Sequence, residues 1–190
     1  SRMEEGTRAH VKIQKERQRE DSSYEKERYF KYRVEKENLI FIVDGRADGI
    51  VPKSYIEEIK STYMPLEELT EDYNFLHWAQ VMFYGFMHCY EEELQEINLL
   101  LTYYNLETEI SRTFERAYSI QTLEEFVDRT IEEYLKFVRE DLHWKEERNL
   151  SLRSLGFPFT QYREGQRDLA VDVYRTLRQG GKLFAKAPTG

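Results

Sequence analysis

The segment Glu58-Ile59-Lys60 places a carboxylate and an ammonium group two residues apart in a stretch that has the pattern of a strand. Because strand side chains alternate, Glu58 and Lys60 share one face, roughly 7 Å apart, and Ile59 points into the core. The carboxylate can hold a hard cation, and such a cation lowers the pKa of a bound water. The lysine can orient that water or offset negative charge on a phosphate. A surface ion pair is the commoner meaning of Glu-x-Lys, so this pair alone is weak evidence.

A second acid, Asp48, ends the segment Gly45-Arg46-Ala47-Asp48 on the preceding expected strand. From a strand adjacent to Glu58, this acid could complete a metal site. Gly45 removes a side chain at a place where another group can come close. Asp44-Gly45 and Asp48-Gly49 are also good turn dipeptides, so a turn is the open alternative for Asp48.

Three further residues have weak individual signals. His10 ends Gly6-Thr7-Arg8-Ala9-His10 in a polar stretch, where a lone histidine is usually solvated. Gln80 and Tyr84 are four residues apart on an expected helix, so they project from one face of it. For these two the alternative is ordinary helix surface and core edge.

Together, these residues resemble the PD-(D/E)XK nuclease superfamily in its RecB-like branch, over roughly residues 3–148. The matching order is Gly-x-x-x-His on a first helix, Gly-x-x-Asp and Glu-x-Lys on successive strands, and Gln-x-x-x-Tyr on the next helix. The resemblance implies that one or two Mg²⁺ or Mn²⁺ ions are bound by His10, Asp48, Glu58 and the carbonyl of Ile59. It also implies that Lys60 is the catalytic lysine, and that Gln80 and Tyr84 support it and contact DNA.

The function implied is metal-dependent hydrolysis of DNA phosphodiester bonds, on single-stranded DNA, in repair or processing. A catalytically silent nuclease-like module that binds DNA beside a helicase is the alternative. A purely structural or docking module, with Asp48, Glu58 and Lys60 dispersed in space, is the third possibility. Some relatives hold an iron–sulfur cluster with four cysteines. The sequence has one cysteine, Cys89, so we expect neither such a cluster nor a disulfide within the chain.

The elements that must position these residues follow from the hydrophobic pattern. Helices are expected over 3–20, 72–92 and 123–148, and strands over 29–34, 39–50, 54–61, 94–104 and 109–118. The continuous apolar run at 39–43 is typical of a strand that is buried on both faces. This order predicts an α/β fold with a central mixed β-sheet flanked by helices, as in a restriction-endonuclease-like core.

Composition changes near Ser151, so we expect a nuclease domain over 1–150 and a second domain over 151–190. Within residues 157–166, a short segment resembles the adenine-recognition segment of superfamily-two helicases of the XPD/DinG type. A helix over 166–179 and a strand over 182–186 would then lead to an ending that resembles the first half of a phosphate-binding loop. The partial nucleotide site implied consists of Tyr162, Arg163, Gln166, Thr189 and Gly190.

This second resemblance implies the start of a motor domain that is truncated inside its phosphate loop. The expected partner is therefore the remainder of the helicase polypeptide. ATP would bind only to that longer parent, and we expect no ATPase activity from this chain.

Charge is distributed unevenly along the 190 residues. The net charge is −8, with +3 over residues 1–33, +4 over 151–190 and −15 between them. The basic ends are thus the better candidates for contacts with DNA phosphates. No apolar run approaches the roughly 20 residues of a membrane span, and the start does not have the pattern of a signal peptide. These features predict a cytoplasmic protein with no membrane partner.

Overall fold

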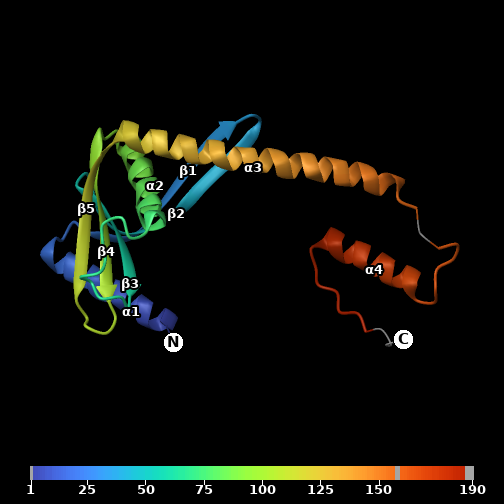
Figure 1. The fold of residues 1–190 in the computed structure, drawn as a ribbon, viewed down its shortest axis with the longest axis horizontal. Helices are drawn as coiled ribbons and strands as arrows, with labels where there is room; N and C mark the ends of the chain where they lie inside the picture. Colours follow the sequence, from blue (N-terminus) through green and yellow to red (C-terminus); the bar gives the residue numbers. More distant parts are fainter. Residues whose placement is uncertain (1, 157–158, 187–190) are drawn as a thin grey trace. The chain divides into compact units, whose positions relative to one another are not determined.

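The computed structural model describes residues 2–156 and 159–186, and it contains a five-stranded sheet (Figure 1). The elements in chain order are α1 (Arg2–Glu20), β1 (Glu25–Lys36), β2 (Leu39–Val51), β3 (Tyr55–Thr62), α2 (Phe75–Glu92), β4 (Glu96–Asn105), β5 (Ser111–Ser119), α3 (Ile120–Ser154) and α4 (Gln166–Gln179). The strands are ordered β1-β2-β3-β4-β5, and neighbours are antiparallel except β3 and β4. A parallel pair needs a crossover, which α2 provides.

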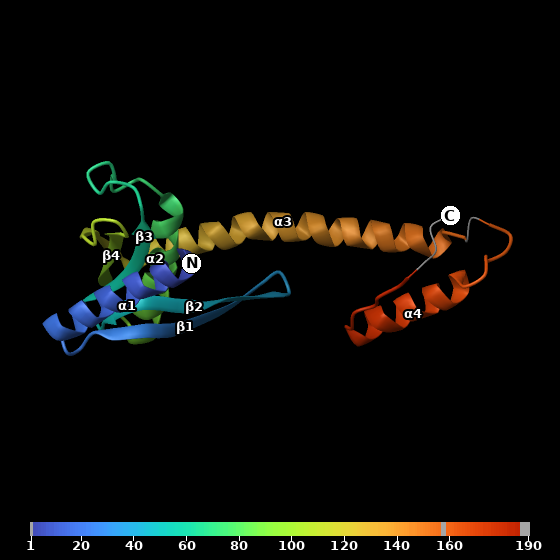
Figure 2. The same ribbon diagram turned by 90° about the horizontal axis from the view of Figure 1, so that it is seen from below.

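Different helices cover the two faces of the sheet, and β3 contributes to both layers. Ile56 belongs to the main core, which includes residues of α2 and of the first part of α3. Ile59 instead packs with Ala9 and Ile13 of α1 in a smaller cluster. Figure 2 shows α1 lying along β2 and β3, against which it packs. Because side chains alternate along a strand, neighbouring residues of β3 can serve opposite layers.

β1 and β2 form a long hairpin that turns at Glu37 and Asn38, whose φ angles are 52° and 62°. Positive φ at both turn residues matches the twist of the flanking strands. The prediction that residues 39–43 are buried on both faces is wrong, since Ile40 and Ile42 are each 55% exposed. This part of β2 pairs with β1 and presents only one face to the core.

The predicted central mixed sheet flanked by helices is confirmed. Two local predictions are wrong. The helix expected to end at residue 148 continues to Ser154 in α3, and residues 182–186 do not form the predicted strand. A strand must satisfy its backbone groups with a neighbour. No strand is assigned within residues 138–156 or 159–186, so the segment has no partner there.

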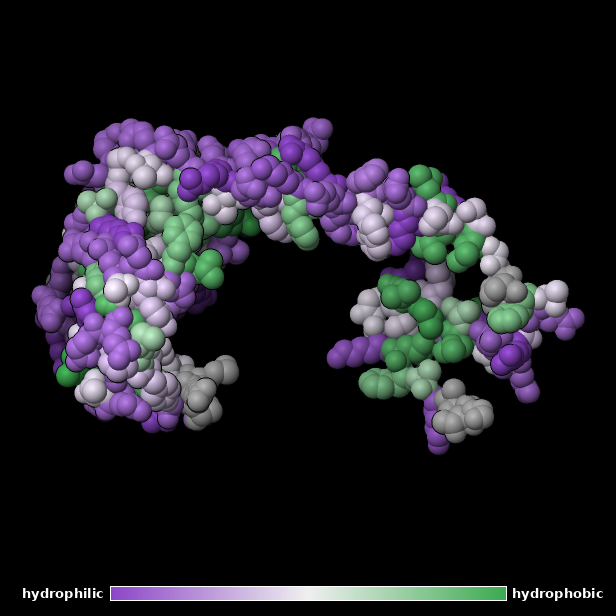
Figure 3. Space-filling view, viewed as in Figure 1, coloured by the Kyte–Doolittle hydropathy of each residue, from purple (hydrophilic) through white to green (hydrophobic). Residues whose placement is uncertain are grey.

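The chain divides into two compact units, Ser1–Phe137 and Val138–Gly190. The sheet lies in the first unit, and α3 begins there and continues into the second. In the second unit, none of the residues of α4 is buried against the described part of the chain. Figure 3 shows apolar side chains on the surface of this unit. The division into a nuclease domain up to residue 150 and a helicase start from residue 151 stays a prediction.

Among the helices described here, none combines the length and the apolar character that crossing a membrane requires.

Candidate active site

Asp48 lies where β2 and β3 separate. The two strands pair over Gly49–Val51, and Asp48 directly precedes this paired stretch. Its Oδ2 accepts a hydrogen bond from the backbone N–H of Ile59 at 2.7 Å. The carboxylate therefore satisfies an amide of β3 that the β2 ladder does not reach. The alternative assignment of Asp48 to a turn is wrong, because the residue belongs to β2 and stands beside the Glu58–Lys60 segment.

His10 reaches this acid from α1. Its Nδ1 lies 3.2 Å from Asp48 Oδ1. The hydrogen bond with Asp48 raises the pKa of His10, and the negative charges of Asp48 and Glu58 act in the same direction against the effect of burial. Ala9 and Ile13 of the same helix pack in one cluster with Ile59, and this packing holds α1 against the sheet. His10 is thus a partner of the Asp48 carboxylate and not a solvated surface residue.

Glu58 is an almost fully buried acid, with 2% of its surface exposed. Lys60 Nζ donates to its Oε1 at 2.5 Å, while its buried Oε2 has no hydrogen-bond partner among the described residues. Burial, followed by repulsion from Asp48, raises the pKa of Glu58 to about 7, although Lys60 opposes the shift. A buried acceptor without a partner is costly unless a hydrogen-bond donor or a cation satisfies it.

Lys60 links β3 to α2. Besides its contact with Glu58, its Nζ donates to Gln80 Oε1 at 2.9 Å. The alternation predicted for the strand is therefore realised, because Glu58 and Lys60 share a face and touch. Gln80 is an exposed residue of α2, and it contacts the ammonium group from the helix surface.

Tyr84 and Gly45 fit each other closely. A Cβ added at Gly45 would stand 2.7 Å from Tyr84 Oη and 3.0 Å from its Cε1. Real side chains do not approach that closely, so a glycine at this position of β2 makes room for the tyrosine. Tyr84 itself is 7% exposed, and burial raises its pKa. The close approach expected at Gly45 is therefore made by a side chain of α2.

The carboxylate oxygens of Asp48 and Glu58 suit a hard divalent cation, although these side chains do not form a complete set of metal ligands. Carboxylate oxygens suit Mg²⁺ and Mn²⁺, and the buried Oε2 of Glu58 is an acceptor that such an ion would satisfy. Within the described residues, no three His, Cys, Asp or Glu side chains gather as a metal-binding group. The backbone N–H of Ile59 and the Lys60 ammonium group each engage one carboxylate oxygen, of Asp48 and of Glu58 respectively.

Sequence reasoning missed a second buried acid, Glu57, on the opposite face of β3. It is fully buried, and its carboxylate accepts hydrogen bonds from Arg17, Tyr24 and Thr102. Arg17 lies two turns after His10 on α1, so this network ties the helix to the sheet. The alternation of side chains along the strand could have indicated this residue, because it puts Glu57 on the face where α1 packs.

Gln14 was missed as well, and it contacts Asp48. It is 3% exposed, and its Nε2 donates to the backbone oxygen of Asp48 at 2.8 Å. The spacing of four residues from His10 could have indicated it, because both side chains then project from one face of the helix.

The residues predicted to bind a nucleotide lie in the other unit. Tyr162 is 51% exposed, and the backbone N–H of Arg163 donates to Gln166 Oε1 at 2.8 Å just before α4. Thr189 and Gly190 lie outside the described residues. The structure thus places three of the five predicted residues in one short segment, and their nucleotide role stays a prediction.

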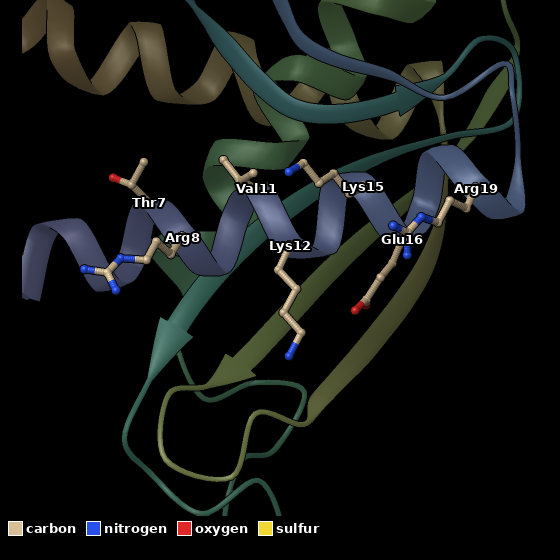
Figure 4. Close-up of a pocket in the computed structure, with 7 residues that line it drawn as sticks. All are labelled: Thr7, Arg8, Val11, Lys12, Lys15, Glu16 and Arg19. Atoms are coloured by element: carbon tan, nitrogen blue, oxygen red, sulfur yellow. The ribbon is translucent and has the colours of Figure 1, made fainter.

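A hollow of about 460 Å³ lies on the outer face of α1, and Figure 4 shows the side chains that line it. Four cations line it, Arg8, Lys12, Lys15 and Arg19, together with one acid, Glu16. Lys12 contacts Tyr104 and Glu109, but the other three cations form no ion pair or hydrogen bond within the described residues. Four of the ten Lys and Arg residues of the basic N-terminal end therefore lie on one helix face.

Comparison with known proteins gives only distant likenesses. No family model matches the chain, and no curated protein matches it. A solved structure titled SSO0001 is 16% identical, with a TM-score of 0.46, and the match covers 66% of this chain and 57% of that one. A proposed exonuclease from Eubacterium rectale is 10% identical, with a TM-score of 0.40 and coverage of 95% and 62%. The chain thus spans less than two thirds of either protein, and likenesses of this strength do not establish a family.

Proposed function

We propose that residues 1–137 carry a divalent-metal-dependent DNA nuclease site centred on Asp48, Glu58 and Lys60. One observation supports this most directly. Side chains that are up to 70 residues apart in sequence form two hydrogen-bonded groups, His10 with Asp48 and Glu58 with Lys60 and Gln80. The two groups meet on β3, because Asp48 accepts from the backbone N–H of Ile59, which lies between Glu58 and Lys60 in sequence. A module without a site would leave these residues dispersed.

The residues divide the work in a way that suits phosphodiester hydrolysis. Asp48 and Glu58 would bind the cation, with His10 beside Asp48 and the carbonyl oxygen of Ile59 as a further metal ligand. When bound, Mg²⁺ or Mn²⁺ makes a bound water more acidic and offsets negative charge on the phosphate. Burial keeps water away from the Glu58 carboxylate, which strengthens its attraction for a cation.

Lys60 supplies the positive charge for the reaction. Its ammonium group is held between Glu58 and Gln80, so its position is fixed before a substrate arrives. A preorganised cation of this kind stabilises negative charge that develops on a phosphate or orients the attacking water. Gln80 and Tyr84 then serve as its support on the α2 side. The exposed Gln80 is the proposed contact with DNA there, since Tyr84 is buried against Gly45.

The proposed substrate is single-stranded DNA. The exposed face of α1, with Arg8, Lys15 and Arg19, offers cations that are not engaged by acids of the described chain. Such cations bind a phosphate backbone without regard to its sequence. A DNA-binding module without activity is the second candidate, because no complete group of metal ligands is gathered among the described residues.

Cleavage of end-labelled single-stranded DNA in Mn²⁺ or Mg²⁺ tests the proposal. We expect cleavage by the unaltered chain and none in chelator. Lys60→Ala and Asp48→Ala should each lower the rate by about 100-fold or more. Lys31→Ala and Asp44→Ala are controls of the same residue types, because both are exposed residues of the β1–β2 hairpin. Equal rates in all five proteins would contradict the proposal, and metal-independent DNA binding without any cleavage would favour the silent module.

A further inference from the structure

Asp48 is not paired with a residue of either neighbouring strand. β1 pairs Arg28 with Ala47 and Lys26 with Gly49, and the ladder omits the position of Asp48 between them. The pairing of β2 with β3 begins only at Gly49. Opposite Asp48, Glu27 of β1 has a φ of 56°, a left-handed conformation that is costly for a residue with a side chain. The proposed metal ligand therefore has no register partner in either β1 or β3.

Gln14 supplies one of the missing partners. Its Nε2 donates to the backbone oxygen of Asp48 at 2.8 Å and to Glu27 Oε1 at 3.1 Å. The side chain is 3% exposed, so these contacts are shielded from water. The amide group thus bridges the two positions at which the β1–β2 ladder is interrupted.

Gln14 and His10 hold the same residue from one helix. His10 contacts the carboxylate of Asp48, and Gln14, one turn later, contacts its backbone oxygen. The other carboxylate oxygen accepts from the N–H of Ile59. With its carbonyl and carboxylate both anchored, Asp48 has a defined orientation toward β3.

We propose that Gln14 is a positioning residue, which replaces the missing strand partner of Asp48 and so aims its carboxylate at Ile59 and the cation site. The part of this inference that concerns a cation rests on the proposed nuclease function. The part that concerns the orientation of Asp48 does not. Partners that orient a ligand in this way typically change metal affinity by about 10-fold to 100-fold when removed.

The test compares Gln14→Met with Gln18→Met. Methionine keeps the length and much of the packing of glutamine but donates no hydrogen bond. Gln18 is a matched control on the next turn of α1, since its Nε2 donates to a backbone oxygen outside the site, that of Tyr24, at 3.4 Å. Gln14→Leu provides a second variant of similar size that also donates no hydrogen bond, in case the thioether disturbs the packing.

The first readout is hydrogen exchange of the Ile59 amide without metal, with the other β3 amides as internal reference. If Gln14 positions Asp48, this amide should exchange about 10-fold faster in the Gln14 variants and at the unaltered rate in Gln18→Met, because a looser acceptor protects it less often. The second readout is Mn²⁺ binding by titration calorimetry, where the Kd should rise by about 10-fold in the Gln14 variants alone.

Each outcome decides between the possibilities. Unchanged exchange of Ile59 in folded Gln14 variants would overturn the positioning role, and so would equal acceleration in Gln18→Met, which would show general loosening of α1. Faster exchange confined to the Gln14 variants, with no Mn²⁺ binding by the unaltered chain, would uphold the positioning role and refute the metal site.

Discussion

The burial of Glu58 predicts that stability falls as pH rises toward neutrality. The side chain is 2% exposed, and burial together with repulsion from Asp48 raises its pKa from 4.5 to about 7. A carboxyl group with a raised pKa binds its proton more tightly in the folded state than in the unfolded state. Its contribution to stability is therefore complete below about pH 4.5 and is lost as pH rises through about 7.

The size of this effect follows from the two pKa values. Each tenfold difference in proton affinity corresponds to about 1.4 kcal/mol, so the free energy of unfolding should fall by at most about 3 kcal/mol between pH 4.5 and pH 7. His10 also has a raised pKa, and its contribution is present below 6.5 and lost as pH rises through its folded value. The total slope therefore includes both groups, and only a substitution of Glu58 isolates the contribution of Glu58.

Urea unfolding of the unaltered chain and of Glu58→Gln, in chelator at about pH 5 and about pH 8, separates the contributions. Glutamine keeps the shape of Glu58 but never ionises. We expect similar stabilities at the lower pH, where Glu58 is protonated, and a variant that is more stable by about 1–3 kcal/mol at the higher pH. Glu35→Gln, at an exposed position of β1, is the control. If the difference in the free energy of unfolding between Glu58→Gln and the unaltered chain is the same at both pH values, the raised pKa of Glu58 is wrong.

Two further predictions concern the surroundings of the site. Gly45→Ala would bring a Cβ within 2.7 Å of Tyr84 Oη. It should therefore lower the free energy of unfolding in urea by about 1–3 kcal/mol and lower the cleavage rate. Gly181→Ala is the control and should change neither, because the nearest neighbour of its added Cβ lies at 3.7 Å. Replacing Arg8 and Arg19 by glutamine should weaken binding of single-stranded DNA in chelator and flatten its dependence on log salt by about 1.4. An unchanged salt slope would remove the outer face of α1 from the DNA path.

The contact between Glu58 and Lys60 could be predicted from sequence because it depends on one local rule, the alternation of side chains along a strand. The α/β order was predictable for a similar reason, since each element carries its own hydrophobic period. Residues 39–43 show the limit of such patterns. An apolar run is the same in a doubly buried strand and in a hairpin, and only the pairing of β2 decides that Ile40 and Ile42 are exposed.

The contacts around Asp48 could not be predicted locally, because they depend on where strands stop pairing. Neither the hydrogen bond to Ile59 nor the role of Gln14 follows from residue types, since both arise from the interrupted ladders. The strand expected at 182–186 failed for a related reason. Its residues favour an extended chain, but a strand exists only beside another strand.

A crystal structure of the chain soaked in Mn²⁺, with anomalous data, would show directly whether Asp48 and Glu58 bind a metal ion. We expect a manganese peak bound by the carboxylates of Asp48 and Glu58, with His10 beside it and Oε2 of Glu58 among the ligands. Manganese bound elsewhere in the same crystals, with Asp48 and Glu58 free of it, would refute the proposed metal site.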